Sequence, residues 1–296
     1  MNYYNEIKNE LIDSEIYKKI KNYSINNNEL NSYYNVGKLL NEAGKCYGEG
    51  IIKEYSKKLT LDLGRKYTKS SLYNMLRFYN YAESKKFQTV SGKLTWSHYC
   101  ELLSINDINK INYYINVSIN QNLSVRQLRE KIKLQEYERL DESTKNKLIN
   151  NLNLKIADSI KHPITIINKY DTSNISEKML KGLIIDNIDR FLNELGEGFT
   201  YVSNEYKIRI NKNYNYIDIL LFNIKFNCYV VIELKVTELK KEHIGQIQVY
   251  MNYIDENIKN INHDKTIGII IAKYNNEFVM RYCSDPRIYN TTYELV

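Results

Sequence analysis

Two apolar segments that each carry one acidic residue constrain this fold most. Residues 228–232 form a run typical of a buried β-strand, and Glu233 follows it directly. Residues 216–222 form a second apolar segment, which contains Asp218. If the two segments pair as a hairpin about residues 225–226, Asp218 falls directly opposite Glu233, because antiparallel strands pair in a fixed register.

Facing carboxylates of this kind need a partner. Cross-strand neighbours have Cβ atoms about 5 Å apart, and two carboxylates at that separation repel each other unless a proton or a cation lies between them. A hard divalent ion with oxygen ligands is the natural occupant. Lys235 lies two residues after Glu233, so the two side chains share one strand face. Its ammonium group can then face a phosphate.

Length and composition narrow the class of protein. The chain has 296 residues, which is enough for two domains, and its 43% hydrophobic and 26% charged content is that of an ordinary soluble protein. It has no apolar stretch near 20 residues and no basic-then-apolar start. The four cysteines are scattered without a CxxC pair, which indicates reduced thiols and argues against a zinc site. We therefore expect a cytoplasmic protein with no membrane partner.

The net charge of +7 is unevenly distributed. Residues 1–150 hold 24 Lys and Arg against 17 Asp and Glu, whereas residues 151–296 hold 18 of each. A basic half joined to a neutral half with a metal-type site suggests a polyanionic partner. The composition, rich in Lys, Asn and Tyr, also raises the Lys content by itself, so charge alone leaves this interpretation open.

The first half of the chain has the spacing of helices. Apolar residues recur at helical intervals over 30–40 and 51–63, and Thr68 to Ser71 begin another helix with capping hydroxyls. A charged, Asn-rich stretch then ends at Pro163. We expect a helical, basic domain over residues 1–150, for binding DNA or for assembly, a linker over 151–170 and a second domain over 171–296.

A basic stripe marks the last helix of the first half. Ser124 is the expected N-cap of a helix that runs on to Leu140. Arg126, Arg129 and Lys133 lie on one side of it, at i, i+3 and i+7. Such a stripe is either a solvated face or a surface that contacts nucleic-acid phosphates.

The second half alternates helices and strands. A helix begins at Ser176, with apolar residues on one side, and Gly196 ends it. Strand-like segments follow over 199–202 and 206–210, then the hairpin of Asp218 and Glu233, a helix over about 241–257, and a last clear strand over 266–272. This order predicts a compact α/β unit with a mixed sheet and helices on both faces.

This arrangement resembles the PD-(D/E)XK (restriction-endonuclease-like) nuclease fold. In that superfamily, one acid on a central strand and an acid-x-Lys element on the next strand hold a divalent metal ion. Asp218 matches the first acid, and Glu233 and Lys235 match the second element. Gln246 and Tyr250 resemble the Gln-x-x-x-Tyr element of some branches.

A closer resemblance, to the YhcG-type family of bacterial proteins, covers nearly the whole chain. Members join a helical N-terminal domain to a PD-(D/E)XK nuclease domain. The resemblance rests on motifs in both halves, namely residues 94–99, 124–128, 191–196, 231–235 and 242–246. One departure is Lys181, where the family pattern carries a glutamate on the first helix of the nuclease domain. Glu177, one turn earlier, is the candidate substitute.

The resemblance implies a Mg²⁺-dependent (or Mn²⁺-dependent) nuclease acting on DNA, with RNA left open. Asp218, Glu233 and the carbonyl of Leu234 would hold the ion, with Glu177 as a further ligand, and Lys235 would stabilise the transition state. Gln246 and Tyr250 would position the phosphate or the lysine, or would simply pack the sheet. Lys240, Lys241 and His243 would contact the substrate backbone.

Other interpretations stay open at this point. The departure at Lys181 favours a catalytically inactive nucleic-acid-binding or interaction module on a nuclease fold. The residues leave open cleavage specificity, endo- or exonuclease action and oligomeric state, a homo-oligomer included. The fold class alone suggests a role in restriction or in defence against foreign DNA.

Overall fold

The structure is a computed structural model that describes the chain apart from residues 1–2, 19–24, 49, 65, 85–92 and 171–173. It divides into two compact units, residues 1–137 and 138–296. The sequence expectation placed the first domain at 1–150 and a linker at 151–170. In the structure this linker segment contains a 3₁₀ turn and a short strand, both of which belong to the second compact unit.

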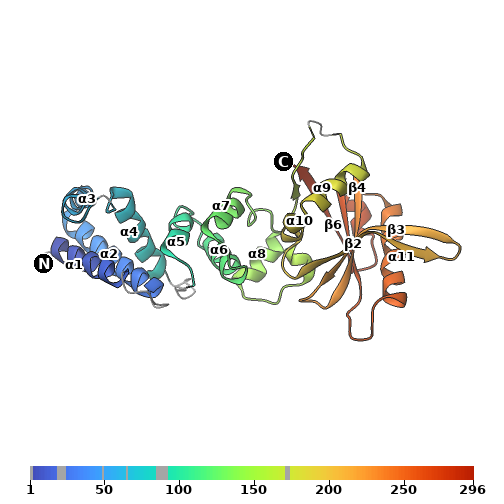
Figure 1. Ribbon diagram of the computed structural model, residues 1–296, viewed down its shortest axis with the longest axis horizontal. Helices are drawn as coiled ribbons and strands as arrows, with labels where there is room; N and C mark the ends of the chain where they lie inside the picture. The colour runs from blue at the N-terminus through green and yellow to red at the C-terminus, as the bar shows by residue number, and fades with distance from the viewer. Residues whose placement is uncertain (1–2, 19–24, 49, 65, 85–92, 171–173) are drawn as a thin grey trace. The chain divides into compact units, whose positions relative to one another are not determined.

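The first unit is helical, as the sequence predicts (Figure 1). Thr68 and Ser124 are helix N-caps, because each hydroxyl accepts a hydrogen bond from the backbone N–H three residues later. None of the described helices is long and apolar enough to cross a membrane. The helices are α1 (Tyr3–Lys18), α2 (Ile25–Tyr47), α3 (Gly50–Leu63), α4 (Lys69–Glu83), α5 (Trp96–Leu102), α6 (Ile108–Asn120) and α7 (Val125–Lys133).

The predicted extent of the last helix is wrong. The sequence suggested that the helix capped by Ser124 continues to Leu140, but α7 ends at Lys133. Gln135 has a φ of 53°, in the left-handed region that a helix does not tolerate. The residues after Lys133 therefore form turns instead of a helix, and the side chains of Tyr137 and Leu140 are buried there.

The second unit is a mixed six-stranded sheet with the strand order β1-β6-β5-β4-β3-β2. The β2–β3 and β3–β4 pairs are antiparallel, and the other pairs are parallel. The elements are α8 (Glu142–Ile149), η1 (Ile156–Ser159), β1 (Ile164–Ile166), α9 (Glu177–Asp186), α10 (Ile188–Leu195), β2 (Phe199–Ile210), β3 (Asn213–Asn223), β4 (Cys228–Glu238), α11 (Lys241–Asn257), β5 (Ile267–Tyr274), α12 (Glu277–Arg281) and β6 (Ile288–Leu295).

Helices cover both faces of this sheet, as predicted. Val230 and Ile232 of β4 pack into one core with apolar residues of α9 and α10. Val231, between them, packs into a second core with residues of α11. A strand covered on both faces needs apolar residues at every position, which explains the unbroken run that the sequence shows.

Several boundaries differ from the sequence expectation. The single helix expected from Ser176 is two helices, α9 and α10, separated at Asn187. The two strands expected over 199–210 are one strand, β2, whose pairing with β3 shifts between Tyr201 and Ser203. Strands β1 and β6 were not predicted.

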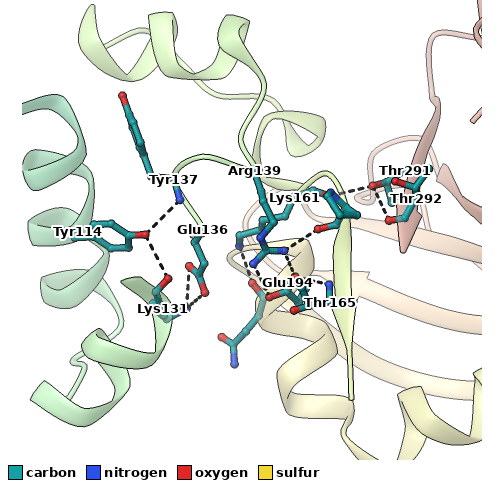
Figure 2. A network of polar contacts seen from close by, with 12 residues as sticks. Tyr114, Lys131, Glu136, Tyr137, Arg139, Lys161, Thr165, Glu194, Thr291 and Thr292 are labelled. Atoms are coloured by element: carbon teal, nitrogen blue, oxygen red, sulfur yellow. Dashed lines mark hydrogen bonds and ion pairs between the residues drawn. The ribbon is translucent and has the colours of Figure 1, made fainter. Parts of the chain in front are cut away.

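A buried ion pair holds β1 against α10 (Figure 2). Arg139 makes a bidentate contact with Glu194 of α10 and also donates to the carbonyl of Pro163, at 2.7 Å. The Glu194 carboxylate accepts the backbone N–H of Thr165 in β1, at 2.9 Å. This network adds side-chain contacts to a strand of only three residues, which has three ladder pairs with β6.

Candidate active site

The register of β3 and β4 brings Asp218 beside Glu233. The observed ladder pairs Leu220 with Val231 and Ile219 with Ile232, so the next pair along is Asp218 and Glu233. Asp218 Oδ2 accepts the backbone N–H of Leu234, at 3.0 Å, which turns its carboxylate toward β4. The register of the two strands is thus the one that the sequence predicts.

Glu233 is an incompletely compensated buried carboxylate. The residue is 2% exposed, and its Oε1 accepts a hydrogen bond from Lys235 Nζ, at 2.9 Å. Its Oε2 is buried without a hydrogen-bond partner among the described residues. Burial, followed by the negative charge of Asp218, raises the pKa of Glu233 to about 7, against the lowering effect of Lys235. Glu233 Oε2 is therefore a buried acceptor oxygen to which none of the described residues donates a hydrogen bond.

Lys235 lies among the carboxylates of the site. Its Nζ is 3.8 Å from Glu177 Oε2, in addition to its contact with Glu233, and its side chain is largely buried. Burial opposes the ammonium charge, but the surrounding carboxylates outweigh it and raise the pKa of Lys235. Lys235 therefore stays charged at neutral pH.

Helix α9 delivers a second ammonium group. Ser176 caps this helix, and Lys181 follows Glu177 by one turn, so both face the strand ends. Lys181 Nζ donates to Asp218 Oδ1, at 3.1 Å, and lies 3.0 Å from Glu205 Oε1. Burial opposes the charge of Lys181, but these two carboxylates raise its pKa overall. The departure noted in the sequence thus places a cation against the first acid of the site.

Glu205 is the site residue that sequence reasoning missed. The pair Lys207 and Tyr216 in the β2–β3 ladder, continued by two residues, places Glu205 opposite Asp218. Its φ of 50° departs from extended backbone, so the strand pattern is interrupted at this residue. Pairing β2 with β3 by register would have found it.

Gln246 and Tyr250 form a hydrogen-bonded pair on α11. Gln246 Nε2 donates to Tyr250 Oη, at 3.0 Å, as the i,i+4 spacing allows. Tyr250 packs in the core beneath the sheet, and burial raises its pKa, with a further rise from the charges of Glu233 and Asp218. The pair therefore lies within electrostatic reach of the two carboxylates.

The start of α11 groups the remaining predicted residues of this unit. Lys240 precedes the helix, and its backbone N–H donates to His243 Nδ1, at 3.1 Å. Lys240 and Lys241 are exposed, and His243 is half-buried. Burial lowers the pKa of His243, and the positive charges of Lys235 and Lys240 lower it further. His243 is therefore neutral at neutral pH.

The basic stripe of the first unit is partly compensated. Arg126, Arg129 and Lys133 are all exposed on α7. Arg129 forms a bidentate ion pair with Glu101, in which Nε and Oε2 are 3.1 Å apart. That carboxylate removes one of the three positive charges that the sequence offers to phosphates.

The donor set fits a divalent ion. Across the residues that the structure describes, no three His, Cys, Asp or Glu side chains form a ready-made metal cluster. The unsatisfied Oε2 of Glu233, beside Asp218, supplies oxygen atoms of the kind that Mg²⁺ and Mn²⁺ prefer. Leu234 lies in the site through its N–H, and Glu177 lies at its edge, through its contact with Lys235.

Family models match both halves of the chain. Residues 158–294 match the YhcG PDDEXK nuclease domain, and residues 9–139 match the DUF1016 N-terminal domain. A curated relative, "Putative nuclease YhcG" of Escherichia coli (strain K12), is 26% identical over 267 residues, which are 78% of this chain and 71% of the relative.

Solved structures match part of the chain. A repair endonuclease from Pyrococcus abyssi matches with 19% identity and a TM-score of 0.30, over 42% of this chain and 49% of its own. EndoMS, in a complex with double-stranded DNA, matches with 20% identity and a TM-score of 0.32, over 42% of this chain. The matched region spans about half the length of these solved chains, 49% and 48%.

Proposed function

Because the chain belongs to the YhcG PDDEXK nuclease domain family over residues 158–294 and to the DUF1016 N-terminal domain family over residues 9–139, we propose that it is a nuclease that hydrolyses DNA with a divalent metal ion. The metal is Mg²⁺ or Mn²⁺. The observation that carries this proposal is Glu233, a buried carboxylate with one unsatisfied oxygen beside a second carboxylate.

Each residue of the site has a role in this proposal. Asp218, Glu233 and the carbonyl of Leu234 hold the ion, with Glu177 at the edge of the site. When bound, the ion makes a coordinated water more acidic and offsets phosphate charge. Lys235, held by Glu233, presents its ammonium group to the developing negative charge on the phosphate oxygens.

Other side chains orient the substrate. Tyr250 and Gln246 support the phosphate or Lys235 from α11, and Lys240, Lys241 and His243 contact the nucleic-acid backbone. In the first unit, Arg126 and Lys133 contact DNA phosphates with their exposed charges. Arg129 contributes less, because it is paired with Glu101. RNA presents the same phosphodiester chemistry, so a substrate comparison must decide between the two. Cutting both strands of a duplex needs two sites, which a homo-oligomer would supply.

One observation favours a second function. Lys181 donates to Asp218 and so compensates one of the two proposed metal ligands. A protein that uses this pair in place of a metal ion would be a catalytically inactive nucleic-acid-binding module. Salt-sensitive DNA binding that survives loss of Asp218, with no Mn²⁺ binding by isothermal titration, would identify it.

Cleavage assays test the proposal directly. With Mg²⁺ or Mn²⁺, we expect the purified protein to cut DNA. Asp218→Asn and Lys235→Met should each reduce the rate by at least about 10²-fold, because the first removes a metal ligand and the second removes the cation that faces the developing negative charge. The control is Glu238→Gln, which removes an exposed carboxylate from the same strand, outside the site. Cutting by both site variants at the wild-type rate would show that the activity belongs to another site or to a contaminant.

A further inference from the structure

The far end of the β2–β3 hairpin is a basic, aromatic ribbon. Residues 206–217 contain no Asp or Glu. They contain three cations, Lys207, Arg209 and Lys212, together with three tyrosines, at 206, 214 and 216. β2 is the edge strand of the sheet, and Figure 1 shows the two strands continuing side by side into the hairpin near α11.

The ribbon has one buried face and one exposed face. Ile208 and Ile217 are fully buried and pack into the core with apolar residues of α11. The register pairs Lys207 with Tyr216, and Arg209 with Tyr214. Residues directly opposite each other share a face, so these four side chains form a single surface, which we name the ribbon face.

The cations of the ribbon face, Lys207 and Arg209, and Lys212 in the turn beyond it are uncompensated. Within the described part of the chain, no carboxylate pairs with Lys207, Arg209 or Lys212. Lys207 Nζ lies 3.8 Å from the centre of the Tyr214 ring, and Arg209 Nε donates to the carbonyl of Asn211, at 3.2 Å. Tyr214 and Tyr216 are 56% and 52% exposed. Cations and aromatic rings therefore alternate on a surface that faces solvent.

The ribbon face begins at the proposed active site. Glu205 and Asp218, which flank the ribbon at its base, both contact Lys181. A strand rises about 3.3 Å per residue, so Tyr214 lies about 13 Å along β3 from Asp218.

We propose that the ribbon face binds an unpaired stretch of the nucleic acid next to the bond that is cut. Lys207, Arg209 and Lys212 contact its phosphates, and the rings of Tyr214 and Tyr216 stack on its bases. Aromatic stacking with cations along the backbone is how proteins bind single strands. A two-stranded ribbon can also enter the major groove of a duplex, but Ile208 and Ile217 at the base of this one are buried against α11, which leaves only its tip free to insert. The inference rests on the proposed nuclease function.

Binding without cleavage tests the inference. Fluorescence anisotropy of a labelled oligothymidine is measured with the full chain in EDTA, so that the result does not depend on catalysis. We expect Tyr216→Ala to weaken binding by roughly 5- to 150-fold, the loss typical of one stacked base. Tyr216→Phe keeps the ring and should bind like the wild type. The double variant Lys207→Ala/Arg209→Ala should lower the salt slope by about 1.4, since each phosphate contact contributes about 0.7 on a single strand.

A charge-matched control separates the ribbon face from general electrostatics. Lys155→Ala/Lys265→Ala removes two exposed lysines of the same unit that pair with no carboxylate in the described part of the chain, and should leave the slope unchanged. An equal loss in this control, or unchanged binding by Tyr216→Ala, would overturn the inference. Tighter binding of a matched duplex would overturn the choice of a single strand. Normal oligothymidine binding by a protein that never cuts DNA would refute the proposed function and leave the binding surface standing.

Discussion

Two buried glutamates of the second unit differ in their hydrogen-bond partners and in their pKa. Glu194 and Glu233 are both 2% exposed. Glu194 has Arg139 and a backbone N–H as partners (Figure 2), and although burial opposes its ionisation, these partners lower its pKa. Glu233 has Lys235 as its one hydrogen-bond partner among the described residues, and its pKa rises to about 7. The Glu194 carboxylate is part of a complete hydrogen-bond network, whereas one oxygen of Glu233 has no hydrogen-bond partner among the described residues.

The difference separates a structural carboxylate from a functional one. Burying a charge costs several kcal/mol unless partners compensate it, and Arg139 does so for Glu194, where β1 meets α10. At the Asp218–Glu233 pair the protein carries that cost without full compensation. Perturbed carboxylates of this kind concentrate where a ligand or a reaction supplies the missing interaction, which is why we propose the active site at Glu233 and not at Glu194.

The largest expected effect is an opposite response to the same substitution. At pH 7.5 in EDTA, Glu194→Gln should lower the free energy of unfolding by roughly 3–5 kcal/mol, because Arg139 is left buried without its counter-charge. Glu233→Gln should raise it by about 3 kcal/mol, because it removes a carboxylate that is more easily ionised in the unfolded chain. Urea unfolding followed by circular dichroism measures both. A loss of stability in both variants would show that the two carboxylates are alike.

The pH dependence sharpens the same contrast. Glu233 has a raised pKa in the folded protein, so between its ordinary pKa of 4.5 and about 7 the folded state binds more protons than the unfolded state. Its contribution to stability is therefore present below pH 4.5 and is lost as the pH rises through 7, by about 3 kcal/mol. Glu194 has a lowered pKa, so its contribution is present above pH 4.5 and is lost as the pH falls further.

Unfolding curves across this range check the two signs. The stability gap between Glu233→Gln and the wild type should close as the pH falls from 7.5 to 4.5, with EDTA present throughout. The gap between the wild type and Glu194→Gln should close only below pH 4.5. A constant gap for Glu233→Gln would mean that its carboxyl group has an ordinary pKa in the folded protein.

The contrast also marks what the sequence could predict. The register that brings Asp218 opposite Glu233 follows from two adjacent apolar strands and a short turn, so local pairing was enough to predict the neighbourhood of the two carboxylates. The capping hydroxyls of Thr68, Ser124 and Ser176 predicted three helix starts for the same reason. Interactions between near neighbours in sequence leave a readable pattern.

Non-local contacts leave no such pattern. Strand β1 has three residues and pairs with β6, about 130 residues later, and polar residues interrupt the apolar pattern of β6. Glu194 meets Arg139 across 55 positions, and Lys181 meets Asp218 across 37. The sequence flagged Lys181 through the family pattern, but only the packing of α9 on the sheet places its ammonium group against Asp218.

Substitution of Lys181 gives the smallest expected effect and the most specific test. Lys181 partly compensates the charge of Asp218, as Arg139 compensates the charge of Glu194. Two charges about 4 Å apart near a protein surface interact by about 4 kcal/mol at most, and solvent screening reduces this. Lys181→Met removes the ammonium group that competes with a metal ion for Asp218. We expect Mn²⁺ to bind this variant about tenfold more tightly, which is about 1.4 kcal/mol, as measured by isothermal titration.

Lys178→Met is the matched control, because it removes the same charge from the exposed side of α9, one turn before Lys181. It should leave Mn²⁺ affinity nearly unchanged, since a solvent-exposed charge at a distance is screened. An equal gain in Mn²⁺ affinity in both variants would show that the loss of one positive charge, and not the contact of Lys181 with Asp218, causes the effect. Unchanged Mn²⁺ affinity in Lys181→Met would mean that the contact of Lys181 with Asp218 does not oppose metal binding. The Lys181–Asp218 pair would then be a structural ion pair, like that of Arg139 and Glu194.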